Sequence, residues 1–147
     1  MAARVYDILD RKGPDVLTTG PETTVREAIT KMVDRNVGSI VVLEDGEVVG
    51  IFTERDYLRR IALQGRTSKG TAIEEVMTPD VIAVTPDYEV EDCLSVMTQN
   101  KCRHLPVMEN GELSGIISIG DCVKHLHQHA RTRLDDLTQY VQGRYPG

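Results

Sequence analysis

Two short motifs pair a hydroxyl side chain with a carboxylate three positions later, Thr53 with Asp56 and Ser118 with Asp121, and a glycine precedes each motif by three positions. At the start of a helix, such a carboxylate can accept hydrogen bonds from both hydroxyls of a ribose, and the unpaired backbone N–H groups attract anions. The same spacing is typical of a capping box, in which the two side chains only bond the start of the helix. The two roles are compatible, so the motifs indicate two helix caps that can also serve as sugar-binding sites.

These motifs belong to two copies of one longer pattern. Shifting the sequence against itself by 65 residues (121 − 56) places Pro14-Asp15-Val16 on Pro79-Asp80-Val81 and Gly46-Glu47 on Gly111-Glu112, with no gap up to the two acids. A repeat of this length without insertions indicates a duplicated supersecondary unit. We therefore expect the binding or catalytic residues to occur as two related sets that face each other.

Hydrophobic spacing predicts the same five elements in each copy: strand, helix, strand, strand, helix. A capping box at Thr24 and Glu27 opens the first helix. Asp45-Gly46 and Asn110-Gly111 lie between short apolar runs and are typical of two-residue hairpin turns. The expected helices are 25–35, 54–63, 90–100 and 119–129, with short leading helices at 6–12 and 71–77, and the expected hairpin strands are 39–43, 48–52, 105–108 and 113–117.

The copies divide the chain into three predicted regions. The stretch 64–70 is polar and bracketed by glycines, which indicates a linker, so one repeat is expected over residues 1–69, the second over 70–130 and a helical tail over 131–147. Leu134, Leu137 and Val141 give the tail an apolar stripe that has no counterpart in the first copy. We expect this stripe to dock on the body or on a partner subunit, because the mixed charges around it do not suit a membrane anchor.

Composition limits the class of protein and its partners. The chain has 147 residues, of which 40% are hydrophobic, enough for one compact domain or two interlocked half-domains. Its net charge of −6 disfavours nucleic acid and anionic lipid as partners, and no apolar run approaches the roughly 20 residues of a membrane span. Cys93, Cys102 and Cys122 are odd in number and form no C-x-x-C pair, which argues against a disulfide framework. Without a secretion signal, a soluble cytoplasmic protein is expected.

The order of these features resembles a tandem pair of CBS (cystathionine-β-synthase) domains over residues 5–129. The resemblance includes both hydroxyl–acid motifs, both hairpins and the phrases Val76-Met-Thr-Pro79 and Cys102-Arg-His-Leu-Pro-Val107. It implies an α+β fold in which two β-α-β-β-α repeats pack sheet to sheet with pseudo-two-fold symmetry, a C-terminal helix beyond them, and a homodimer. It also implies adenosine-containing ligands in the clefts between the repeats, with AMP the preferred candidate and ADP, ATP, NAD or S-adenosylmethionine the others.

Carried over position by position, the resemblance implies two unequal clefts. Arg103 and His104 stand where the family often places phosphate-binding residues, and Gly38 and Ser39 are their equivalents in the other copy. The cleft expected to contain Arg103 and His104 should therefore prefer phosphorylated ligands, because charge-assisted bonds to phosphate are strong. The first cleft is expected to use Thr53, Asp56, Val81, Cys102, Arg103 and His104, and the second Ser118, Asp121, Leu17, Val37, Gly38 and Ser39.

Several functions remain open at this level. The leading hypothesis is a regulatory module, not an enzyme, that signals to an unidentified effector protein in trans, because the repeats and the tail account for the whole chain. A nucleotide-processing enzyme would use His104 and Asp56 as acid and base. A redox adaptor of a thioredoxin-type partner is the third hypothesis; Cys102 can be either a thiol of lowered pKa or a buried apolar residue. His125 and His129 can bind zinc only with a third ligand that is not evident from spacing.

Overall fold

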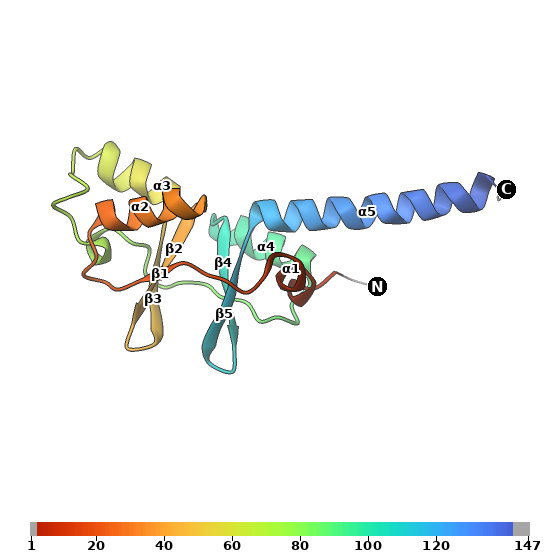
Figure 1. Cartoon of the computed structure of the whole chain (residues 1–147), viewed down its shortest axis with the longest axis horizontal. Coiled ribbons are helices and arrows are strands. Elements are labelled where there is room, and N and C mark those ends of the chain that lie inside the picture. Colours follow the sequence, from red (N-terminus) through yellow and green to blue (C-terminus); the bar gives the residue numbers. More distant parts are fainter. Residues whose placement is uncertain (1–2, 143–147) are drawn as a thin grey trace.

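The structure is a computed structural model that describes residues 3–142, with side chains from residue 3 to residue 131. It is an α+β fold of two half-units that lie side by side, each with its own hairpin and helices (Figure 1). The elements are α1 (Val5–Lys12), β1 (Thr18–Thr19), α2 (Val25–Arg35), β2 (Ser39–Glu44), β3 (Glu47–Thr53), α3 (Glu54–Tyr57) followed by a π-helical turn (Leu58–Ala62), a 3-10 turn (Ile73–Glu75), α4 (Val90–Asn100), β4 (His104–Glu109), β5 (Glu112–Ser118) and α5 (Ile119–Gln142).

Both hairpins turn at the predicted dipeptides. The φ angles are 53° and 80° at Asp45 and Gly46, and 55° and 79° at Asn110 and Gly111. Positive values at both central residues are what a two-residue turn needs to match the twist of its strands. β2 pairs antiparallel with β3 and β4 with β5, each with one register shift at the equivalent place in the repeat. Both predicted hairpins are therefore confirmed, and they share the same register shift at equivalent positions.

The strand expected at the start of each repeat is short in the first half and nearly lost in the second. In the first half, Thr18 and Thr19 pair parallel with β2, and the Val41 N–H donates to the carbonyl of Leu17 at 2.9 Å. The residue equivalent to Val41 in β4 is Pro106, which has no N–H to donate. The second half accordingly keeps a single parallel bridge, from Val84 to Val107.

The segments that lead into each half cross to the other half. α1 precedes the first half but packs on β5 and α5 of the second, where Leu9 lies against Gly115. The 3-10 turn precedes the second half, yet the Ile73 N–H donates to the carbonyl of Thr23 at 2.8 Å. The helix predicted at 71–77 is only this turn, because Thr78 leaves it to form a bridge with Ile51 of β3. This exchange ties the two halves together.

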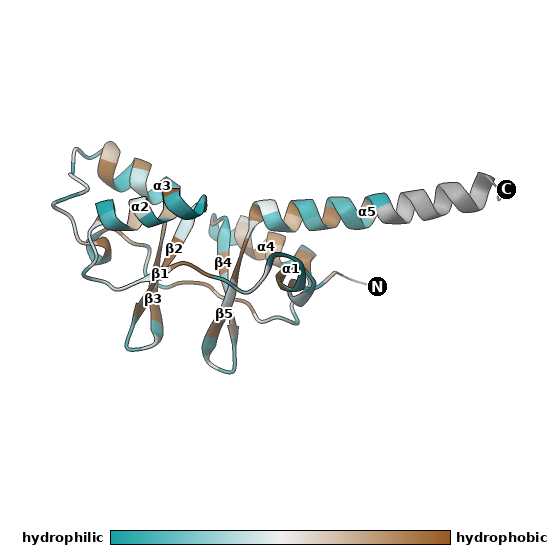
Figure 2. Cartoon of the chain, viewed as in Figure 1, coloured by the Kyte–Doolittle hydropathy of each residue, from teal (hydrophilic) through white to brown (hydrophobic). Residues whose placement is uncertain are grey.

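Each half has its own hydrophobic core, and the sheets meet between them. Ile40 and Val42 belong to the first core, while Val41, between them on β2, is also completely buried. Since side chains alternate along a strand, Val41 points to the opposite face, and its equivalent Pro106 is buried too. This burial on both faces is what the predicted sheet-to-sheet packing requires. Figure 2 shows hydrophilic residues at the tips of both hairpins, away from these cores.

The C-terminal region forms one helix instead of a helix and a separate tail. α5 runs without a break from Ile119 to Gln142, and its first part packs on α4 and α1. In Figure 1 it is the longest element and extends past the second half. The predicted stripe of Leu134, Leu137 and Val141 lies outside the residues whose side chains are described.

Candidate functional site

The first hydroxyl–acid motif forms a capping box at the start of α3. Thr53 Oγ1 accepts a hydrogen bond from the Asp56 N–H at 3.2 Å, and Asp56 Oδ2 accepts one from the Thr53 N–H at 3.0 Å. The hydroxyl of Thr78 also donates to Asp56, at 3.2 Å from Oδ1. Asp56 is 8% exposed. The predicted cap is confirmed, and its carboxylate also bonds the segment that crosses from the second half.

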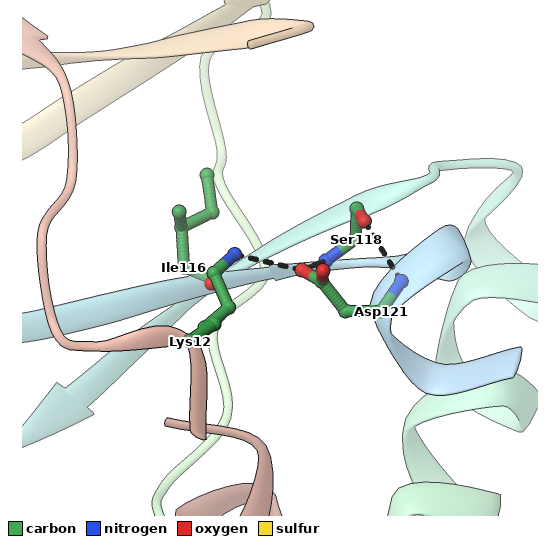
Figure 3. A network of polar contacts seen from close by, with 4 residues as sticks. All are labelled: Lys12, Ile116, Ser118 and Asp121. Atoms are coloured by element: carbon green, nitrogen blue, oxygen red, sulfur yellow. Dashed lines mark hydrogen bonds and ion pairs between the residues drawn. The ribbon is translucent and has the colours of Figure 1, made fainter. Parts of the chain in front are cut away.

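The second motif caps α5 in the same way but has a different third partner. Asp121 Oδ2 accepts from the Ser118 N–H at 2.9 Å, and Ser118 Oγ accepts from the Asp121 N–H at 3.1 Å. The Lys12 ammonium donates to the same Asp121 oxygen at 2.7 Å and to the Ile116 carbonyl at 3.0 Å (Figure 3). Burial acts to raise the pKa of Asp121, but the bonds from Lys12 and Ser118 outweigh it and lower that pKa. Asp121 is therefore held as a carboxylate.

Arg103 and His104 lie beside the second motif. His104 is paired with Ser118 in the β4–β5 register, and the carbonyl of Arg103 accepts from the Ile119 N–H at 2.8 Å. Along the backbone, both residues are therefore adjacent to the second motif, because β4 and β5 form one hairpin. The assignment of their side chains to the Asp56 cleft stays a prediction.

Gly38 and Ser39 lie beside the first motif for the same reason. Ser39 is paired with Thr53 in the β2–β3 register, and the Glu54 N–H donates to the Gly38 carbonyl at 3.1 Å. Gly38 is also where the halves approach each other: a Cβ there would lie 3.0 Å from Glu54 Oε1 and 3.4 Å from His104 Nε2. The two motifs are therefore linked through the His104 side chain, which reaches from the second half to the first.

His104 is the titratable group between the two motifs. Burial lowers its pKa, while the carboxylates of Asp121 and Glu54 act to raise it and the charges of Lys12 and Arg103 act to lower it further. The net direction is downward, so the imidazole is neutral at neutral pH. A neutral imidazole between carboxylates from both halves gains a proton readily when a further anion arrives, because negative charge favours its protonated form.

The apolar residues predicted for the two clefts lie at several places around the junction. Leu17 packs against the first core and Cys102 against the second. Val81 is half-buried in the segment between the halves. Val37 is 41% exposed and lines a cavity of 380 Å³ between α2 and α3, which Glu54 also lines. A second cavity of 380 Å³ lies between β1 and α2 and includes Leu17.

The cysteines have the properties of buried thiols. Burial raises the pKa of Cys102, and it raises those of Cys93 to about 11 and of Cys122 to about 12. Since the thiolate is the reactive form, these directions favour the apolar role of Cys102 over a redox-sensing thiol.

Two other sequence-based questions concern metals and membranes. Among the residues with described side chains, no group of three His, Cys, Asp or Glu is placed to hold a metal ion, so His125 and His129 gain no third ligand. Within residues 3–142, no helix combines the length and apolar character needed to cross a bilayer.

Sequence reasoning missed Lys12 and Thr78, the third partners of the two acids. The 65-residue offset places Lys12 on Met77 and Gly13 on Thr78, just before the matching prolines. The difference between the copies was visible there, but the crossing of the leading segments was not. Only that crossing brings Lys12 to Asp121 and Thr78 to Asp56.

Comparison with protein families matches both halves of the chain to the same family. The family described as "CBS domain" matches residues 5–63 and again 73–128. The chain is 39% identical over 150 residues to the CBS domain-containing protein CBSX3, mitochondrial, of Arabidopsis thaliana, across 96% of this chain and 73% of that protein.

Solved structures agree with this likeness. A protein with CBS domains from Burkholderia ambifaria superposes with a TM-score of 0.82 at 40% identity, over 84% of this chain and 93% of that one. A CBS domain protein from Pyrobaculum aerophilum, solved complexed with AMP, gives a TM-score of 0.71 at 27% identity, over 80% and 88% of the two chains. A hexameric CBS-CP12 protein from bloom-forming cyanobacteria gives a TM-score of 0.76 at 27% identity, over 84% and 71%.

Proposed function

Because this chain belongs to the CBS domain family, with both halves matched, we propose that it is a regulatory module that binds adenosine nucleotides, AMP foremost, at its two hydroxyl–acid motifs. One observation carries the proposal: Asp56 and Asp121 occupy equivalent places, each a carboxylate at a helix start where the two halves meet. Such a carboxylate can take two ribose hydroxyls, and the nearby helix N-terminus favours phosphate. The AMP complex of the relative from Pyrobaculum aerophilum supports this ligand class.

The base and the phosphate of the ligand would use different parts of the junction. Apolar residues around the junction, Val81 with Cys102 and Leu17 with Val37, offer surfaces for adenine. Beside Ser118 and Asp121, Arg103 offers a cation for phosphate, and His104 offers an imidazole that a phosphate would help to protonate. ADP, ATP, NAD and S-adenosylmethionine share the ribose and base that these groups would recognise, so they remain ligands to be compared with AMP.

The role that we propose is regulatory, with the signal read by an effector protein in trans. In this proposal, residues 1–69 form the first repeat, residues 70–130 form the second, and residues 131–147 form a tail. A ligand between the halves that binds one of their relative arrangements more tightly shifts the population toward it, and a tenfold difference in affinity corresponds to about 1.4 kcal/mol. Because α1 and the 3-10 turn each pack on the opposite half, such a shift would move both leading segments.

A cytoplasmic location stays a prediction, and the Arabidopsis relative is named as mitochondrial.

We propose a homodimer as the assembly, supported by apolar residues that are exposed on one face of the first half. Val33 on α2 is 72% exposed and Leu58 beside α3 is 59% exposed, and both line the cavity between these helices. Leu58→Glu should convert a dimer to a monomer in light scattering coupled to gel filtration. Glu47→Lys, at the hydrophilic tip of a hairpin, is the control. A wild-type protein that is monomeric at micromolar concentration would remove the dimer from the proposal.

One experiment separates a binding module from a nucleotide-processing enzyme. The protein is titrated calorimetrically with AMP, ADP, ATP, NAD and S-adenosylmethionine, and each mixture is then analysed chromatographically for breakdown. Saturable heats with intact nucleotide support the module. Turnover that is lost in His104→Gln would instead assign His104 an acid or base role.

A further inference from the structure

The Asp121 carboxylate differs from the equivalent Asp56 carboxylate because it already forms an ion pair with a lysine of the same chain. The Lys12 ammonium lies 2.7 Å from Oδ2, the oxygen that also accepts from the Ser118 N–H, and 3.0 Å from the Ile116 carbonyl. The side chains of Lys12 and Asp121 are 33% and 27% exposed, so solvent reaches the pair and the lysine has room to move. A ribose hydroxyl that approaches Asp121 must compete with this ammonium.

In the first half, the equivalent carboxylate and carbonyl accept hydrogen bonds from uncharged donors. There the Ile51 carbonyl, equivalent to that of Ile116, accepts from the Thr78 N–H at 2.8 Å, and Asp56 accepts from the Thr78 hydroxyl. The residue at the position of Lys12 is Met77, which packs against Gly50 and carries no charge. The ammonium is therefore a property of the second site, and the chain itself provides an uncharged version of the same arrangement.

The surroundings of Lys12 determine which ligand can displace it. His104 is the first residue of β4 and is paired with Ser118, and Arg103 immediately precedes it, so two further basic residues lie beside this acid along the backbone. If a nucleoside took Asp121, the lysine would lose its carboxylate and be left near these residues with no new anion. A nucleotide that takes Asp121 brings a phosphate, to which the freed ammonium can transfer its hydrogen bond.

We propose that Lys12 is the residue that makes the second site selective for phosphorylated adenosine ligands: it holds Asp121 in the free protein and moves to the phosphate when ribose hydroxyls take its place. This inference rests on the proposed binding function and assigns that site its ligand class. It predicts that the two halves differ in preference although they share one motif, with adenosine tolerated better at Asp56 and AMP favoured at Asp121.

The test uses Lys12→Met, which introduces the side chain found at the equivalent position of the first half. AMP and adenosine are titrated into the full isotope-labelled chain, and affinity at each site is read from its capping-box amides, Thr53 for the first and Ser118 for the second. Lys12→Met should lower AMP affinity at the Ser118 site by about 10-fold or more, because a charge-assisted bond is lost. Adenosine affinity there should be unchanged or higher, and both affinities at the Thr53 site should be unaffected.

Two companion variants separate the possible outcomes. Lys12→Arg keeps the charge and should keep the preference for AMP, while Lys69→Met removes one positive charge from the exposed linker and should leave both sites as in the wild type. Equal losses of AMP and adenosine in Lys12→Met, or no change in either, would overturn the role of Lys12 while the binding function stands. A wild-type protein whose Thr53 and Ser118 amides respond to neither ligand would overturn both.

Discussion

Asp121 and Asp56 cap equivalent helices but differ in the charge of the group that bonds them from the crossing segment. Asp121 accepts from the Lys12 ammonium at 2.7 Å, whereas Asp56 accepts from the Thr78 hydroxyl at 3.2 Å. Both donors come from the segment that leads into the other half. A duplicated motif thus gives two chemically distinct sites because the leading segments differ in sequence.

Removing the first acid separates binding from helix capping. Asp56→Ala should weaken AMP binding at the Thr53 site by roughly 10-fold or more, because a charged acceptor for two hydroxyls is lost. It should also lower stability by about 0.5–2 kcal/mol, since it removes half of a capping box. Thr53→Ala is the matched variant, because it loses the other half of the box and keeps the carboxylate. If Asp56→Ala melts earlier yet binds AMP like the wild type in calorimetry, the motif is a cap alone.

Removing the basic side chain beside the second site should discriminate between ligands. Arg103→Ala is expected to weaken AMP by about 10-fold at the Ser118 site and to change adenosine little, because only AMP offers a phosphate to the guanidinium. The measurement is the shift of the Ser118 amide during titration with each ligand. Arg59→Ala, an exposed arginine of the first half, is the control. Losses of the same size for both ligands would mean that Arg103 does not contact phosphate.

The buried imidazole predicts a dependence of stability on pH. Burial lowers the pKa of His104 in the fold, so the unfolded chain binds that proton more tightly. Its contribution to stability is therefore complete above the unfolded value of about 6.5 and is lost as the pH falls toward the lower folded value. His104→Gln should flatten the decline in the free energy of unfolding between about pH 7 and pH 5. Denaturant titrations at several pH values test this, and parallel slopes for the variant and the wild type would contradict it.

Two glycines test how tightly the leading segments pack on the opposite hairpins. A Cβ on Gly50 would lie 2.3 Å from Met77 Sδ, and one on Gly115 would lie 2.8 Å from Leu9 Cδ2. Gly50→Ala should therefore lower the free energy of unfolding by about 1–3 kcal/mol, as overpacking does. Shortening the neighbour in Gly50→Ala/Met77→Ala should recover part of the loss in denaturant melts. A single variant as stable as the wild type would show that Met77 is not held against β3.

Local patterns predicted the repeated elements well because the forces that form them act within a few residues. Asn110-Gly111 specifies its turn through backbone angles alone, and Thr53 and Asp56 cap a helix through bonds three positions apart. The loss of the first strand in the second half depends on Pro106, a single missing donor in a neighbouring strand. That effect could be anticipated only by someone who knew which strand Val84 pairs with.

The candidate sites were predicted less completely because they depend on which segments exchange between halves. Sequence alignment of the copies identified His104 as a residue of the junction, and its assignment to the Asp56 cleft stays a prediction. The structure pairs His104 with Ser118 in the strand register and places its Nε2 near Gly38 of the first half. Lys12 lies 109 residues from Asp121 in the sequence, and only the packing of α1 on the second half brings the two together.

The central claim, that adenosine nucleotides bind where the two acids cap their helices, is tested most directly by calorimetric titration of AMP into the wild type and into Asp56→Ala/Asp121→Ala. We predict saturable binding to the wild type, and a loss of roughly tenfold or more in affinity at each of the two sites for the double variant, because each site loses its charged acceptor. Circular dichroism should show that the variant keeps its fold. Undiminished AMP binding by the folded double variant, or no binding by the wild type, would contradict the account.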